Sequence, residues 1–160
     1  MFFKKNKSAF DIGTALVKFI NPEESLINGL NELTEDKSRK ISDEIYCLYV
    51  ITILIAVKET VSDIKTTASI LDAFFKAIKE SREFNANEVL DGGKNRYIAY
   101  EEAFYTPHHN NPLVIIGKQF SEFCDCEMDL DLITTVGIIF GATLASVSEF
   151  IQSYKIDCVK

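Results

Sequence analysis

The sequence predicts an all-α fold, a helical bundle of about five to seven helices that forms one domain over residues 1–160. Almost every apolar pattern along the chain repeats with helical period. The two longest uncharged stretches exceed the roughly four to eight residues of a usual strand. Hydrophobic residues make up 47% of the 160 residues, so one self-sufficient core is expected.

The first predicted helix is amphipathic and runs from Phe2 to Ile20. Its polar residues recur at spacings of three and four and therefore share one stripe, although Gly13 weakens the helix. These polar residues are Lys4, Lys7, Asp11, Thr14 and Lys18. A short second helix is predicted next, because Asn21 can cap it and Pro22 fits its first position.

Two uncharged stretches are predicted to form central helices. Ile45–Val57 has thirteen residues without a charge, and Leu132–Ser148 has seventeen. The many β-branched residues of the first stretch would allow a strand, but its length and its flanks favour a helix. Two helices this apolar need cover on every side, which favours a self-associating surface.

Three more helices complete the prediction. The clearest begins near Ile64, after a cap at Thr60 or Ser62. Its expected buried face consists of Ile64, Ala68, Leu71, Phe75 and Ile78. Another covers Tyr97 to Tyr105 and ends before Pro107. The last starts at Pro112, with Asn111 as its cap.

Leu132–Ser148 is predicted to be a helix of a soluble bundle and not a transmembrane segment. A spanning helix needs about 20 predominantly apolar residues. This stretch is shorter and contains five Ser or Thr residues. Asp131 and Glu149 border it, where basic or aromatic flanks would be expected.

Net charge and cysteine content bear on the partner and the location of the protein. The net charge of −7 disfavours nucleic acid as a partner, because such binders cluster Lys and Arg. Four cysteines do not form a disulfide framework in a chain of this length, which favours reduced thiols and a cytoplasmic location. Asp11 and Lys18 interrupt what would be the apolar region of a secretion signal.

The candidate metal ligands are Glu101, His108 and His109, within the segment YEEAFYTPHHNNP. These residue types ligate zinc or iron. Their spacing is poor, since no pair lies one helical turn apart and both histidines follow Pro107. A solvated loop is the favoured interpretation, and the identity of any cofactor stays open.

Two other polar segments carry weaker signals. Cys124 and Cys126 lie among acidic residues, but Cys-x-Cys is not a zinc or redox motif. The acids are expected to favour the first turn of the following helix, with Cys124 packed inward. The segment DGGKN resembles a flexible turn more than an anion-binding loop.

Gly137, Gly141 and Ala145 are the candidate interface residues. Small residues one helical turn apart allow a neighbouring helix to approach closely. With no convergent catalytic set, the sequence favours a non-enzymatic helical interaction protein, acidic and homodimeric. The alternative is a metal- or small-ligand-binding protein that uses Glu101, His108 and His109.

Peripheral membrane contact is a third and less favoured hypothesis. Phe2, Phe3 and Phe10 could lie on a bilayer surface while nearby lysines face anionic headgroups. Docking of the same helix face onto the rest of the domain explains the pattern more simply.

Overall fold

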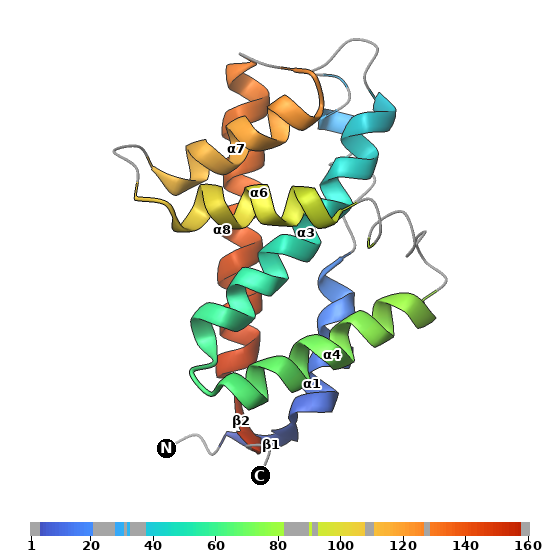
Figure 1. Cartoon of the computed structure of the whole chain (residues 1–160), viewed down its shortest axis with the longest axis vertical. Coiled ribbons are helices and arrows are strands. Elements are labelled where there is room, and N and C mark those ends of the chain that lie inside the picture. Colours follow the sequence, from blue (N-terminus) through green and yellow to red (C-terminus); the bar gives the residue numbers. More distant parts are fainter. Residues whose placement is uncertain are drawn as a thin grey trace.

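A computed structural model shows a helical bundle with one small parallel sheet (Figure 1). It describes residues 4–20, 28–30, 32, 38–81, 90, 93–107, 111–126 and 129–157. The all-α prediction is confirmed. The elements, in chain order, are β1 (Lys5–Ser8), α1 (Ala9–Leu16), a 3₁₀ turn (Val17–Phe19), α3 (Ser38–Thr60), α4 (Ile64–Glu80), α6 (Lys94–Tyr105), α7 (Pro112–Phe123), α8 (Leu130–Gln152) and β2 (Tyr154–Asp157).

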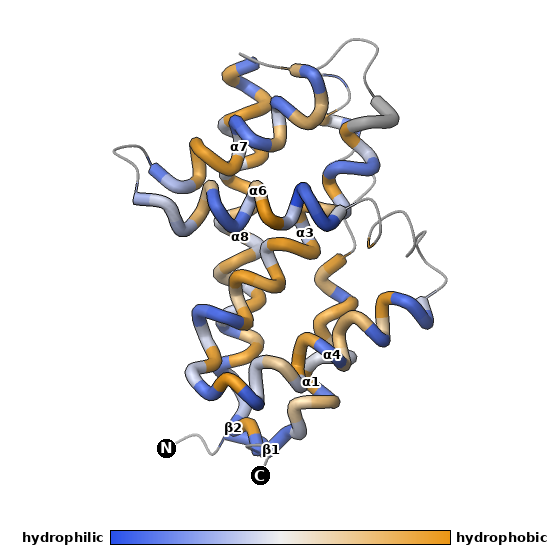
Figure 2. Tube along the Cα trace, viewed as in Figure 1, coloured by the Kyte–Doolittle hydropathy of each residue, from blue (hydrophilic) through white to orange (hydrophobic). Residues whose placement is uncertain are grey.

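Helix α3 forms the centre of the bundle. Every residue from Val50 to Val57 is buried, which confirms the prediction of a central helix over Ile45–Val57. Helix α8 runs along α3 for much of the length of the molecule, while α6 and α7 pack around one half and α1 and α4 around the other (Figure 1). The most apolar segments of the trace lie along α3 and α8 (Figure 2).

The beginning and the end of the described chain meet in the parallel pair β1–β2, in which Lys5 lies opposite Tyr154. The prediction of a continuous helix from Phe2 to Ile20 is wrong over its first part. The strand ends at Ser8, which caps α1 and forms a capping box with Asp11. Pairing with β2 and the Ser8 cap together set the start of the helix at Ala9.

The buried face of α1 differs from the expected one, which included Phe10. Its buried residues are Ala9, Ile12, Gly13 and Leu16, whereas Phe10 is 57% exposed. Gly13 allows a close crossing with α4, because a Cβ there would lie 2.2 Å from the carbonyl oxygen of Ile70. Gly13 therefore has a packing role.

Helix α4 forms where expected, but its cap and its buried face differ from the prediction. Asp63 is the cap, and its carboxylate accepts a hydrogen bond of 2.8 Å from the Thr66 amide. Ile64 is 85% exposed. The residues that face the core are Thr66, Ile70, Ala73, Phe74 and Ile78.

The last three helices form where the sequence predicts them, although α8 is not covered on every side as a central helix would be. Helix α6 ends at Tyr105, and α7 begins at Pro112 with the Asn111 side chain accepting a hydrogen bond from Leu113. Asp129 caps α8 in the same way through Leu132. Cys124 is fully buried after α7, as expected. Of the short helix predicted after Asn21, only residues 28–30 and 32 are described.

Candidate functional site

The predicted metal ligands are only partly visible. Glu101 lies on α6, where its carboxylate forms an ion pair with Lys58 of α3. His108 and His109 lie outside the described residues. Among the residues that the structure describes, no three His, Cys, Asp or Glu side chains gather as a metal site would require. The metal hypothesis stays a prediction.

The predicted interface residues occupy different positions on α8. A Cβ at Gly137 would lie 2.6 Å from the carbonyl oxygen of Leu113, so this glycine already packs against α7 of the same chain. Gly141 is half-buried beside the Leu113 side chain, and Ala145 is exposed. At the same crossing, a Cβ at Gly117 would lie 2.1 Å from the Ile133 carbonyl oxygen. Small residues therefore bring α7 and α8 together within one chain.

One face of α8 points to solvent although the helix is apolar. Across its most apolar 18 residues the mean hydropathy is 1.8, yet only 33% of those residues are buried. We give the name α8 stripe to four exposed residues on one side of the helix, Thr134, Ile138, Ala142 and Ala145. Ile138 is 64% exposed, and neighbouring Val114 of α7 is 39% exposed. The stripe carries no charge between Asp131 and Glu149.

A shallow hollow lies beside the stripe, at the crossing of α7 and α8. Its volume is about 180 Å³, and its lining combines the backbone of Gly137 with the side chains of Val114, Thr134 and Ile138. Such a volume is well below the roughly 300 Å³ of usual small-molecule sites. It suits a single inserted side chain better than a ligand.

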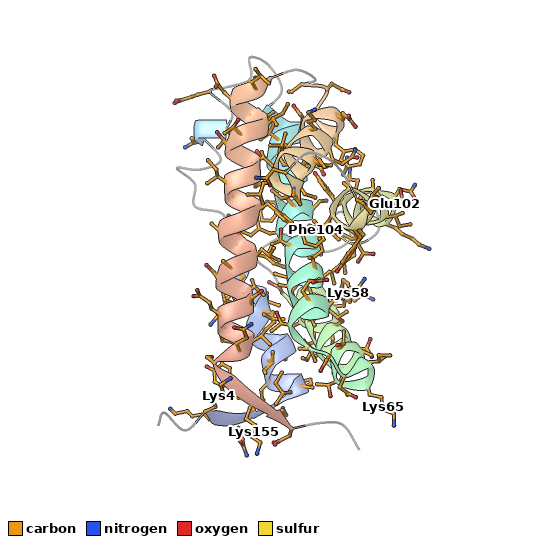
Figure 3. The ribbon with its side chains drawn as sticks, turned by 90° about the vertical axis from the view of Figure 1, so that its left-hand side faces the viewer. Lys4, Lys58, Lys65, Glu102, Phe104 and Lys155 are labelled. Atoms are coloured by element: carbon orange, nitrogen blue, oxygen red, sulfur yellow. The ribbon has the colours of Figure 1, made fainter. Side chains whose placement is uncertain are left out.

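Among the described helices, α8 is long and apolar enough to cross a bilayer, judged by length and composition alone. Its other face does not resemble a lipid-facing surface. Val136, Phe140 and Val147 are fully buried within the bundle core, and the ring of Phe140 lies 5.8 Å from that of Phe104 of α6. Figure 3 shows Phe104 pointing into the bundle.

A buried polar cluster between α3, α6 and the end of α7 was missed by the sequence analysis. Glu44 is only 1% exposed. The Tyr100 hydroxyl donates a hydrogen bond of 2.7 Å to its Oε1, and Arg96 Nε lies 3.0 Å from its Oε2. The Arg96 contact is an ion pair, and Oε2 has no hydrogen-bond donor in the described part of the chain.

The electrostatics of this cluster follow from its burial. Loss of solvent raises the pKa of Glu44 from its usual 4.5 to about 7, while the Tyr100 hydrogen bond and the Arg96 charge oppose the rise. Burial, together with the Glu44 charge, raises the pKa of Cys47 to about 11 and that of Cys124 still further. Both thiols are therefore protonated near neutral pH and are poor nucleophiles.

A signal for the cluster was present in the sequence. Glu44 follows Ile41 by three residues and precedes Leu48 by four, so a helix places it on the same face as two apolar residues. In the sequence prediction this flank serves only as support for a helix, and Glu44 has no assigned role. Comparison with known proteins adds nothing further, since no protein family, curated protein or solved structure matches the chain.

Proposed function

We propose that the protein is a non-enzymatic helical interaction protein that associates with a second copy of itself through the α8 stripe. The observation that carries the proposal is the mismatch on α8 between strong hydropathy and low burial. Water-exposed apolar surface is unfavourable by about 25 cal/mol per Å², and a partner that covers it recovers that free energy.

The shape of the stripe supports a second copy as the partner. Two-fold symmetric interfaces require a surface that complements itself. Ile138 is the large side chain of the stripe, and Ala142 lies one helical turn further along. In an antiparallel pair centred near position 140, Ile138 of one copy lies opposite Ala142 of the other, so each ridge faces a small residue.

In this proposal the protein self-associates in the cytoplasm and is not an enzyme. Cysteine usage in the sequence supports the compartment. The raised pKa of the Cys47 thiol, caused by burial, supports the second point, because a protonated thiol cannot serve as a ready nucleophile. We expect a weak homodimer, since one helix face covers less than the roughly 800 Å² per partner of a standard interface.

Sedimentation equilibrium of three proteins tests the proposal. Wild type is expected to approach twice the 18.1 kDa chain mass with rising concentration. Ile138→Glu places a charge in the stripe and is expected to raise the dissociation constant at least about tenfold. Ile64→Glu is the matched control, because Ile64 is 85% exposed on α4, away from the stripe, and its substitution is expected to leave association unchanged.

Two results would overturn the proposal. The first is a wild-type protein that stays monomeric at every accessible concentration. The second is recovery of wild type with cell membranes and loss of that recovery in Ile138→Glu, which would assign the stripe to a bilayer instead of a second copy.

A further inference from the structure

Helix α6 is held to the bundle by few buried side chains. Tyr100 is its one buried residue, whereas α4 buries five and α7 buries four. Its polar contacts with α3 include the buried Glu44 cluster, the partly exposed Lys58–Glu101 pair and a Tyr105–Glu59 hydrogen bond near its end. Elements with few buried apolar contacts are the ones that open locally at low cost.

The buried contact depends on the charge of one carboxyl group. From its own helix, Glu44 feels Asp43 and Cys47. From α6 it faces Arg96, Tyr97 and Tyr100, and from the end of α7 it faces Cys124. Of the groups named here, Arg96 is the one positive charge, and its side chain is 35% exposed. A single, partly solvated guanidinium offsets only part of the cost of burying an ionised carboxylate.

We propose that α6 is a strap that closes on α3 in a proton-dependent way, held down when Glu44 is neutral and locally released when Glu44 is ionised. In the closed state Oε2 is buried and has no hydrogen-bond donor among the described residues, which disfavours the charged form. Release of α6 exposes the carboxylate to water, where the charged form is the stable one. Higher pH therefore favours the open strap.

The size of the effect follows from linkage between protonation and opening. The closed state has a Glu44 pKa of about 7, and a solvated glutamate in the open state has the usual 4.5. Between pH 6 and pH 8 the equilibrium constant for opening is then expected to rise about tenfold. The proposal is independent of self-association, because it concerns a helix that the α8 stripe does not include.

Hydrogen exchange read by mass spectrometry tests the strap. Exchange of the α6 amides is measured at pH 6 and pH 8, and each rate is divided by the intrinsic rate at that pH to give an opening constant. In wild type we expect the α6 constant to rise about tenfold, while that of α4 changes little. Glu44→Gln keeps the side-chain shape without the charge, so its α6 constant is expected to stay low and independent of pH.

Glu101→Gln is the matched control, since it removes a carboxylate from the partly exposed pair on the same helix. It is expected to keep the wild-type pH dependence. The strap is refuted by equal wild-type constants at the two pH values, by α4 and α6 rising together, or by Glu44→Gln retaining the pH dependence. If Glu44→Gln does not fold, the wild-type protein alone still tests the strap, because the opening constant of α6 must rise between pH 6 and pH 8 while that of α4 stays nearly constant.

Discussion

Glu44 shows how strongly one buried carboxyl group affects the energetics of this bundle. Its pKa in the folded protein is raised to about 7 from 4.5, mainly by burial. A group with a raised pKa contributes stability that is full below the unfolded pKa and is lost as pH rises through the folded pKa. Glu44 therefore stabilises the fold most below pH 4.5 and progressively less up to about pH 7.

Urea denaturation of wild type and Glu44→Gln tests this sign. Between pH 5 and pH 8 the wild-type free energy of unfolding is expected to fall relative to that of the variant by on the order of 2 kcal/mol. The measured quantity is the change with pH in the difference between the two unfolding free energies. Any effect of the new amide on Arg96 that does not depend on pH therefore cancels. If the unfolding free energies of the two proteins changed with pH in parallel, Glu44 would have the same pKa in the folded and unfolded states, which would contradict this account.

Gly137 is predicted to be intolerant of any side chain. Gly137→Ala brings a methyl group against the Leu113 carbonyl, so the helices must separate, at a cost of about 1 to 3 kcal/mol in unfolding free energy. Gly141→Ala is the control, because its new methyl group meets the movable end of the Leu113 side chain at 3.2 Å. Thermal melts of both variants check this, and an equal loss of stability in the two would contradict the assigned close approach.

At the scale of single elements, capping residues and the helical periodicity of apolar residues predicted most of the helices. Asn111 with Pro112 marked the start of α7, and the apolar stretch Ile45–Val57 marked the centre of α3. Strand β1 could not be predicted, because the local sequence KNKS has no strand pattern and its partner β2 lies at the other end of the chain. Nonlocal pairing decided the conformation there.

The candidate site was predicted less well than the fold, for a related reason. Periodicity identified α8 as an apolar helix, but which of its faces stays open depends on where α3 and α7 lie. Glu44 was missed because its burial comes from α6, a helix some fifty residues further along the chain. Sequence alone shows which face of a helix a residue occupies and leaves open what covers that face.

The cap of α8 gives a prediction at this scale. Asp129 accepts a hydrogen bond of 2.9 Å from the Leu132 amide, so Asp129→Ala is expected to lower the unfolding free energy by about 1 kcal/mol. Asp131 lies in the first turn without acting as the cap, so Asp131→Ala is expected to cost less. Chemical denaturation of the pair would contradict the assignment if Asp131→Ala were the more damaging change.

At the scale of the whole molecule, net charge opposes the proposed self-association. The chain carries a net charge of −7. Its positive residues Lys4 and Lys155 lie at the end of the molecule that holds the sheet (Figure 3). Asp131 and Glu149 border the stripe, so an antiparallel pair brings these acids near one another. Apolar burial must outweigh this repulsion for the dimer to form.

Salt is therefore predicted to strengthen self-association. Raising the ionic strength from about 0.05 M to about 0.5 M shortens the range of repulsion between exposed charges, and the dissociation constant is expected to fall a few-fold. Sedimentation equilibrium at the two salt concentrations measures it. An association weakened by salt would instead indicate an interface built on opposite charges.

The most direct test of the central claim is hydroxyl-radical footprinting of wild type across a concentration series. It reports whether the α8 stripe is covered in solution, with Ile138 as the probe and exposed Ile64 as an internal reference. Oxidation of Ile138 is predicted to fall as concentration rises through the dimer transition, while oxidation of Ile64 stays constant. Equal oxidation of Ile138 in the monomer and at high concentration would contradict the claim that a second copy covers the stripe.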